Sequence, residues 1–289
     1  MGVCDEPFVG SWALAARALT RRQLQRDFER IHHDVYVARG RRLDAVDRAK
    51  AAGYWAHGNG ILVGHSAAAL HGSLWIDQDL PAEIALATGR RAPAGIVAVR
   101  DTIAAEERCE RLGFAVSTPA RTAFDLGRRL PRERAVVALD DLFRATSLHP
   151  DSVLAVAESH PGARGIRSLR SALALVDAGA QSPPETMTRL LMIDDGLPPP
   201  VTQIPVRYSA HGTLYIDLGW PDRKVGVEYD GRHHWTDPFQ RARDIDRLAV
   251  LSDLGWIIVR AGADLLYRRP HILLERTRAA LRARGAHLD

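Results

Sequence analysis

The sequence has 289 residues, of which 46% are hydrophobic and 26% are charged, as in globular proteins that fold in water. This length suffices for one large domain or two ordinary ones, and no apolar run approaches the roughly 20 residues that a membrane helix needs. The formal net charge is +4, and nearly all the basic residues are Arg, whose planar side chain binds two phosphate oxygens at once. The composition therefore permits nucleic-acid binding, although a nucleotide-biased genome that replaces Lys with Arg explains the same balance.

The first residues, M-G-V-C-D-E-P, lack the basic and apolar segments of a secretory signal. The two cysteines, Cys4 and Cys109, form no disulfide or metal-binding pattern. We therefore expect a cytoplasmic protein with no membrane partner.

Residues 10–33 are predicted to form a basic helix, with Thr20 in an N-cap arrangement that places Gln at the third helical position. A short strand is expected at residues 34–37. A helix followed by a strand is what a winged-helix head would supply, although a full helix-turn-helix is not visible. The alternative is a solvated basic helix surface. The basic residues that we expect to contact DNA here are Arg21, Arg22 and Arg26.

The next 140 residues alternate between the two kinds of element and predict an α/β fold. Residues 43–57 predict an amphipathic helix, residues 61–63 a strand, and Ser66 begins a helix rich in Ala. Residues 82–117 hold short apolar runs separated by turns, as in a small sheet. Helical patterns then continue to residue 178.

Several segments of this part resemble a known family. They are G-S-W-A-L-A-A-R-A-L-T-R-R-Q-L, V-Y-V, H-S-A-A-A-L-H-G, and T-P-A-R-T-A-F-D-L with A-L-D-D-L-F-R. Together they are similar to the AbiEi-type antitoxin module over about the first 150 residues. The resemblance implies an α+β region with a winged-helix head that binds DNA and autoregulates a toxin–antitoxin operon. It also implies DNA and a cognate toxin as partners.

The segment G-A-Q-S-P-P, at residues 179–184, predicts a domain boundary, which places one domain at residues 1–180 and another at 181–289. Ser182 is a good N-cap for a new helix, and this puts Glu185 in the first turn. The helix dipole alone accounts for an acid at that position, or Glu185 is available for chemistry.

Residues 214–218 and 225–229 are apolar runs separated by turn-forming residues, which predicts a β-hairpin. Because side chains alternate along a strand, Leu214, Ile216 and Leu218 are expected to share one face.

Three acids should project from the opposite faces of this hairpin. They are Asp217, Glu228 and Asp230. One register of the two strands brings these carboxylates together, which is costly unless they meet a cation or hydrogen-bond donors.

The C-terminal third resembles a second family. S-P-P-E-T, Asp217, V-E-Y-D-G-R-H-H, a charged helix and G-W-I-I-V-R follow the order and spacing of the Vsr-like endonuclease domains of the PD-(D/E)XK superfamily. The resemblance covers residues 182 to about 270 and implies a restriction-endonuclease-like mixed sheet flanked by helices. It also implies that Asp217 and Glu228 hold Mg²⁺, or Mn²⁺, that Glu185 assists, and that the domain hydrolyses phosphodiester bonds of DNA.

The sequence departs from this family's motif at one position. Asp230 stands where the superfamily has a catalytic Lys, and Lys224 lies roughly 13 Å from Glu228 along the strand. The Vsr-like branch uses His near this place, so His233 or His234 is expected to act as the general base or to protonate a leaving group. The alternative is that both His residues are exposed in a turn.

A charged helix is predicted from residue 238 to residue 254. Its exposed basic residues, which we expect to contact DNA phosphates unless they form ordinary helix ion pairs, are Arg241, Arg243 and Arg247.

The sequence thus predicts a metal-dependent DNA endonuclease domain behind an antitoxin-like module. Two alternatives stay open. The chain can be a DNA-binding regulator that keeps a nuclease fold as a scaffold. It can also be an antitoxin that works by protein contact, either with a cognate toxin or as a homo-oligomer.

Overall fold

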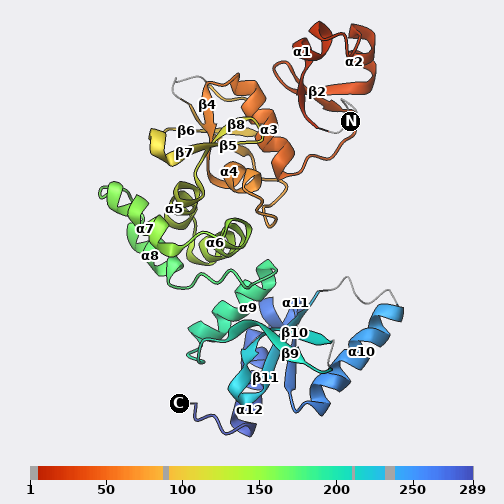
Figure 1. Ribbon diagram of the computed structural model, residues 1–289, viewed down its shortest axis with the longest axis vertical. Coiled ribbons are helices and arrows are strands. Elements are labelled where there is room, and N and C mark those ends of the chain that lie inside the picture. The colour runs from red at the N-terminus through yellow and green to blue at the C-terminus, as the bar shows by residue number, and fades with distance from the viewer. Residues whose placement is uncertain (1–5, 87–90, 210–211, 232–237, 289) are drawn as a thin grey trace. The chain divides into compact units, whose positions relative to one another are not determined.

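The computed structural model describes residues 6–86, 91–209, 212–231 and 238–288, and within residues 238–242 it describes the backbone alone. Contacts divide the chain into two compact units, Met1–Ala174 and Leu175–Asp289 (Figure 1). The sequence placed this boundary between residues 180 and 181. Both units combine helices with β-sheets, so the predicted α/β class is confirmed. Among the described residues, no helix has the length and apolar character needed to cross a membrane.

Unit 1 begins with a small head of two helices and a three-stranded sheet. Helices α1 (Gly10–Ala15) and α2 (Arg21–Asp27) are joined by a turn. Strands β2 (Phe28–His32) and β3 (Val35–Ala38) then pair antiparallel, and β1 (Phe8–Val9) pairs with the other edge of β3. The head thus consists of two short helices followed by a strand hairpin, with β1 added to its edge.

The single helix expected over residues 10–33 is therefore wrong. Arg17 adopts a left-handed conformation, with φ of 54°, which ends the first helix. Thr20 and Gln23 then form a capping box that begins the second. The chain becomes extended at Phe28, whose buried ring packs edge-on against Phe8 at 5.0 Å. Tertiary packing thus ends a helix that the residue pattern alone would continue.

The centre of unit 1 is a five-stranded mixed sheet with helices α3 (Ala45–Ala56) and α4 (Gly64–Leu70) packed against it. In spatial order its strands are β6 (Ile96–Val99), β5 (Ala82–Leu86), β4 (Gly60–Leu62), β8 (Phe114–Ser117) and β7 (Arg108–Arg111). Small side chains such as Ala52 and Ala67 share one buried cluster with Leu62 of the central strand. They let the helices approach the sheet closely.

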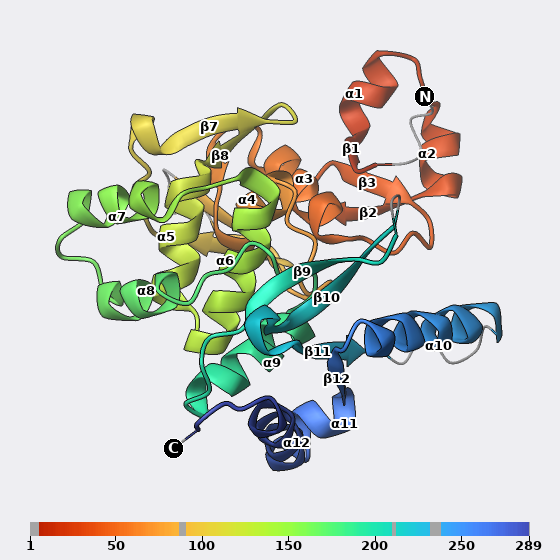
Figure 2. The ribbon, with the colours of Figure 1, turned by 60° about the horizontal axis from the view of Figure 1, so that its bottom comes forward.

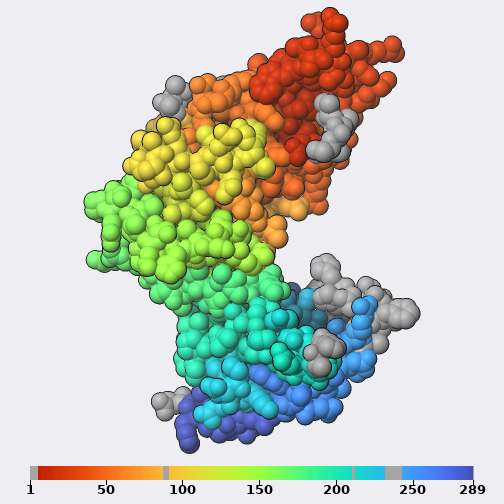
Figure 3. Space-filling model, in the orientation of Figure 1, coloured from red at the N-terminus to blue at the C-terminus, as the bar shows by residue number. Residues whose placement is uncertain are grey.

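Four helices complete unit 1. They are α5 (Pro119–Arg129), α6 (Arg132–Thr146), α7 (Pro150–Ser159) and α8 (Ile166–Leu173). Helix α5 contacts each of the other three and also α4, so it joins this layer to the helices that cover the sheet. The space-filling view shows the succession within unit 1, from the red head through the orange and yellow sheet to the green helices (Figure 3).

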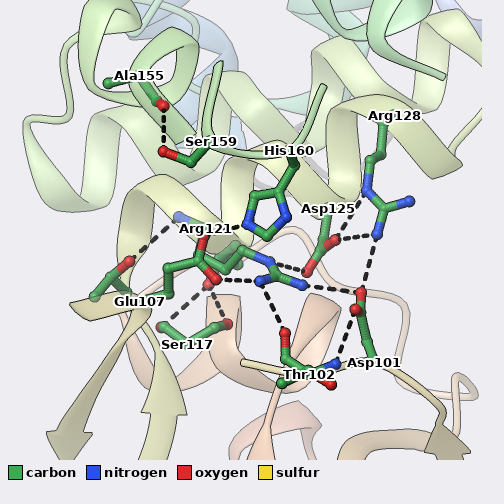
Figure 4. A network of polar contacts seen from close by, with 12 residues as sticks. Asp101, Thr102, Glu107, Ser117, Arg121, Asp125, Arg128, Ala155, Ser159 and His160 are labelled. Carbon is green, nitrogen blue, oxygen red and sulfur yellow. Dashed lines mark hydrogen bonds and ion pairs between the residues drawn. The ribbon is translucent and has the colours of Figure 1, made fainter. Parts of the chain in front are cut away.

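A buried set of ion pairs fastens α5 to its neighbours (Figure 4). The guanidinium of Arg121, which is 1% exposed, donates to Asp125 at 3.0 Å and to Asp101 at 2.9 Å, and it also pairs with Glu107. The second oxygen of Glu107 contacts His160, which follows α7. Because a buried charge is costly without partners, these contacts make Arg121 a structural link between α5, α7 and the segment before β7.

Unit 2 is built on a four-stranded mixed sheet (Figure 2). Its strands, in spatial order, are β12 (Ile257–Gly262), β11 (Val225–Asp230), β10 (Thr213–Trp220) and β9 (Val201–Arg207). Its helices are α9 (Pro183–Asp194), α10 (Pro238–Asp253), α11 (Ala263–Tyr267) and α12 (Pro270–Ala283). Strands β11 and β12 are parallel and α10 lies between them in the chain, which makes a β-α-β crossover.

The predicted hairpin is confirmed. Strands β10 and β11 pair antiparallel, with Leu218 opposite Val227 and Trp220 opposite Val225. A mixed sheet with helices packed on it is also what the resemblance to endonuclease domains implied for this part of the chain.

Replacing Arg121 with Met should lower the stability of unit 1. The change leaves the buried carboxylates of Glu107 and Asp125 beside an uncharged side chain, so the free energy of unfolding should fall by about 3–5 kcal/mol. Urea denaturation followed by circular dichroism measures the loss. The matched control is Arg129→Met. Arg129 is 31% exposed and pairs with Asp101 and Asp125, and both of these keep Arg121 and Arg128 as partners, so this change should cost less than about 1 kcal/mol. Similar small losses in both variants would contradict a structural role for Arg121.

Candidate functional site

Two carboxylates meet where β10 and β11 pair. Because Leu218 lies opposite Val227, Asp217 and Glu228 are the next residues along the two strands. The carboxylate of Asp217 accepts a hydrogen bond from the main-chain N–H of Tyr229 at 2.9 Å. A side chain thus takes the place of a main-chain acceptor at this point of the ladder.

Strand β10 changes face at Asp217. Leu214 and Ile216 belong to an apolar cluster with Leu251 of α10, whereas Leu218 belongs to a separate cluster with Val227. The expected common face for Leu214, Ile216 and Leu218 is therefore wrong at Leu218. The pairing with β9 continues across this point without a register shift, because Ile216 lies opposite Ile204 and Leu218 opposite Thr202.

Glu228 is the second acid of the site and is 9% exposed. Its Oε2 accepts a hydrogen bond from Nη1 of Arg247, on α10, at 2.7 Å. Its Oε1 is buried and has no hydrogen-bond partner among the described residues. A buried carboxylate oxygen without a donor carries a desolvation cost, and such an atom in a native protein usually meets a water molecule or an ion.

The negative charge of Asp217 also lacks full compensation, and this affects the pKa of its carboxyl group. Burial, with a smaller contribution from the nearby charges of Glu185 and Glu228, raises the pKa of this carboxyl group to about 7 against the lowering effect of the Tyr229 N–H. Arg247 lowers this pKa only as the weakest of these influences. The folded protein thus places Asp217 where its negative charge is poorly compensated.

Glu185 lies near this site but is held by its own helix terminus. Its carboxylate accepts hydrogen bonds from Gln181 N and Ser182 Oγ, both at 2.9 Å, and from the side chain of Gln203 at 3.3 Å. Ser182 is the N-cap of α9 and Glu185 lies in its first turn, as expected. Its charge nevertheless reaches Asp217, as the raised pKa of Asp217 shows.

Charged residues dominate the pocket around these acids. It is lined by Asp217, Glu228, Tyr229, Asp230, Asp244, Arg247, Leu248 and Arg260. The four carboxylates exceed the two guanidinium groups, so the pocket carries excess negative charge and suits a cation.

Asp230, which occupies the motif's Lys position, forms an ion pair with Arg260 of β12. The parallel register sets Arg260 directly beside Glu228, so β12 brings a cation to this side of the pocket. Lys224 is engaged elsewhere, because its ammonium donates to the carbonyl of Leu254 at 3.0 Å. Sequence reasoning missed Arg260, since only strand pairing places residues 228 and 260 together.

The basic helix residues have different positions. Arg247 was expected on the exposed side of its helix as a phosphate contact. This expectation is wrong, because its side chain lines the pocket and pairs with Glu228. Arg243 is exposed and has a polar partner of its own. The side chain of Arg241, together with His233 and His234, lies outside the described residues.

The donors of the pocket fit a divalent cation in chemistry, though not as a complete protein cage. Within the described ranges, no group of three or more His, Cys, Asp or Glu is arranged to hold a metal ion. Mg²⁺ is commonly bound by one or two carboxylates with water and substrate phosphates completing its shell. Asp217 and Glu228 can supply that pair, and the unpartnered Glu228 Oε1 is a free oxygen donor among the described residues.

A second site candidate is the exposed face of α2 in unit 1. Arg21, Arg22 and Arg26 are all exposed there, on the second of the two helices of the head. Arg26 forms a surface ion pair with Asp27 at 2.6 Å, whereas Arg21 and Arg22 have no ion pair within the described part of the chain. These two guanidinium groups are thus available to an anionic partner.

Known proteins resemble the chain over most of its length. Residues 59–175 match the family described as the AbiEi antitoxin C-terminal domain. The chain is 32% identical over 265 residues to the uncharacterized protein MT2308 of Mycobacterium tuberculosis strain CDC 1551, covering 89% of this chain and 96% of that protein. The uncharacterized protein Rv2248 of Mycobacterium tuberculosis strain ATCC 25618 matches to the same extent. No solved structure matches the chain at a significant level.

The comparisons confirm the antitoxin-like part of the resemblance, in a range that begins after the head and ends near the boundary of unit 1. The roles expected for the residues of the endonuclease-like part stay predictions.

Replacing Asp217 with Asn should change how stability depends on pH. The folded pKa of about 7 lies above the ordinary value of 3.8, so between these values the folded state keeps a proton that the unfolded state has released. Wild-type stability should fall as pH rises through this window, and the variant should escape the fall. Relative to wild type, the variant should therefore gain about 2–4 kcal/mol between pH 4 and pH 8.

Urea denaturation of both proteins in a metal chelator measures this difference. Asp222→Asn, in the exposed turn of the same hairpin, is the matched control and should show no such gain. If the stability difference between wild type and the Asp217→Asn variant is equal at the two pH values, burial does not disfavour the Asp217 charge.

Proposed function

We propose that this chain, which belongs to the family of the two mycobacterial proteins, is a DNA-binding antitoxin-type component of a toxin–antitoxin pair. The observation that carries the proposal is the match of residues 59–175 to the AbiEi antitoxin C-terminal domain. A cognate toxin and DNA are the partners that this family implies. The same match supports a regulator better than it supports an enzyme.

The head of unit 1 supports DNA as a partner. In a helix-turn-helix the second helix enters the major groove, and here that helix is α2. Its exposed Arg21 and Arg22, which have no ion pair with any described residue, can neutralise phosphates or donate to base edges. Behind it, Leu24 is buried and fixes the orientation of the helix on the head.

Removing the side chains of Arg21 and Arg22 should weaken DNA binding. For the double variant Arg21→Ala/Arg22→Ala, the Kd for the DNA upstream of the protein's own gene should rise about tenfold or more. The plot of log K against log salt should become shallower by about 2, because two phosphate contacts are lost. Fluorescence anisotropy across a salt series measures both quantities.

The matched control removes two exposed arginines of α8, in Arg167→Ala/Arg170→Ala. It changes the net charge equally and should leave the Kd within about twofold. If both double variants lose equal affinity, overall charge rather than α2 binds the DNA, and unchanged binding in the α2 variant excludes the head as the contact.

A second function is favoured by the carboxylate pocket of unit 2. We infer that this unit hydrolyses phosphodiester bonds of DNA with a divalent cation, as the resemblance to Vsr-like endonuclease domains implies. Its support is the excess of carboxylates around Asp217, a residue whose charge the folded protein leaves poorly compensated. A bound Mg²⁺ would activate water and offset charge on the phosphate.

The residues of the pocket have separate tasks in this proposal. Asp217 and Glu228 hold the cation, and Glu185 adds negative charge behind Asp217. Arg260, paired with Asp230, brings positive charge to the motif position that lacks Lys. His233 and His234 are proposed as the groups that move a proton.

Cleavage should depend on both proposed metal ligands. Purified protein is incubated with supercoiled, mismatched and single-stranded DNA in the presence of Mg²⁺ or Mn²⁺. Nicking of at least one substrate is expected, and it should fall to background in Asp217→Asn and in Glu228→Gln. Asp222→Asn should cut like wild type. No metal-dependent cleavage, or cleavage that survives both pocket variants, would exclude the nuclease and leave the regulator.

A further inference from the structure

Arg247 connects α10 to the centre of the carboxylate pocket. One terminal nitrogen of its guanidinium donates to Glu228 Oε2 at 2.7 Å, and the other donates to the main-chain carbonyl of Tyr215. The side chain is 28% exposed, so its charge is partly withdrawn from water. The planar fork thus spans the two strands that carry Asp217 and Glu228.

Of the two guanidinium groups that line the pocket, Arg247 is the one that pairs with Glu228. The second guanidinium, Arg260, forms its ion pair with Asp230. The second oxygen of Glu228 is buried and has no partner among the described residues. Arg247 therefore satisfies one of the two oxygens of this carboxylate.

We propose that Arg247 is a resident cation of this pocket, which a divalent metal ion displaces from Glu228. The inference deepens the second function above and rests on its metal site. A divalent ion carries twice the charge of a guanidinium and can be shared by two carboxylates, whereas Arg247 contacts one. With the ion absent, Arg247 limits the repulsion between Glu228 and its acidic neighbours.

When the metal ion displaces the guanidinium from Glu228, Arg247 can take a different partner while α10 stays in place. Its second contact is with a carbonyl on the exposed residue Tyr215, where water can replace the guanidinium at small cost. A guanidinium released from Glu228 remains at the edge of the pocket and can bind a phosphate with two hydrogen bonds. Arg247 is therefore a positioning residue that exchanges a carboxylate for a DNA phosphate when the metal ion enters.

The test measures Mn²⁺ binding to the full chain in the absence of DNA, with free Mn²⁺ counted by electron paramagnetic resonance. Neutral replacements of Arg247, by Met and by Gln, remove the competing charge, so both should bind Mn²⁺ about tenfold or more tightly than wild type. Gln keeps a hydrogen-bond donor for Glu228 and secures the test if the Met variant folds poorly. Circular dichroism verifies that each variant is folded.

The chain offers a closely matched control. Arg278, on α12, pairs with the carboxylate of Asp195 at 2.7 Å, donates to the carbonyl of the same residue at 3.1 Å, and is 31% exposed. It does not line the pocket. Arg278→Met should therefore leave Mn²⁺ affinity unchanged, while Asp217→Asn and Glu228→Gln should abolish binding.

The possible failures separate the inference from the function on which it rests. If wild type binds Mn²⁺ through Asp217 and Glu228, and the Arg247 variants bind with equal or lower affinity, the displacement of Arg247 is wrong and the metal site stands. If neither wild type nor the Arg247 variants bind Mn²⁺, both are wrong. A tenfold gain shared by Arg278→Met would also overturn the inference, since the effect would then be one of net charge.

Discussion

The pairing of β10 with β11 sets the chemistry of unit 2, because it places Asp217 and Glu228 side by side where water reaches them poorly. The core depends on the same pairing, since it also joins Leu218 to Val227. Strand β10 changes face at Asp217, so that one residue marks the passage between two apolar clusters. The fold therefore holds these carboxylates together whether or not a cation compensates them.

The two units differ in how they treat buried charge. In unit 1, Asp101, Glu107 and Asp125 surround Arg121, and the guanidinium groups of Arg128 and Arg129 complete the set, while His160 contacts Glu107. Charge is balanced there, as expected of contacts that stabilise a fold. In unit 2, carboxylates outnumber guanidinium groups around the pocket, and one oxygen of Glu228 has no described partner. An excess of negative charge with an unpartnered buried oxygen is typical of a ligand-binding or cation-binding site.

Local patterns predicted much of the fold. The hairpin of unit 2 follows from two apolar runs around a turn, and the helix at Ser182 follows from its cap and the prolines after it. Within the head, the capping box at Thr20 was visible, but the left-handed Arg17 that ends the preceding helix was not. Arg17 carries no sequence signature of that conformation, so a break between two helices was missed. In the pocket, Arg247 was assigned to the solvent because helical periodicity cannot tell which partner a half-buried face meets.

By itself, the sequence determined the α/β class, the position of the hairpin, and the three acids that this hairpin carries, since these depend on the order of apolar, turn-forming and charged residues. Only the tertiary structure decided how those acids are partnered. Arg260 comes to Asp230 through parallel pairing of distant strands, and Arg247 comes to Glu228 from a helix packed over them. Contacts between residues far apart in the chain depend on the register and packing of whole elements, which local residue order does not specify.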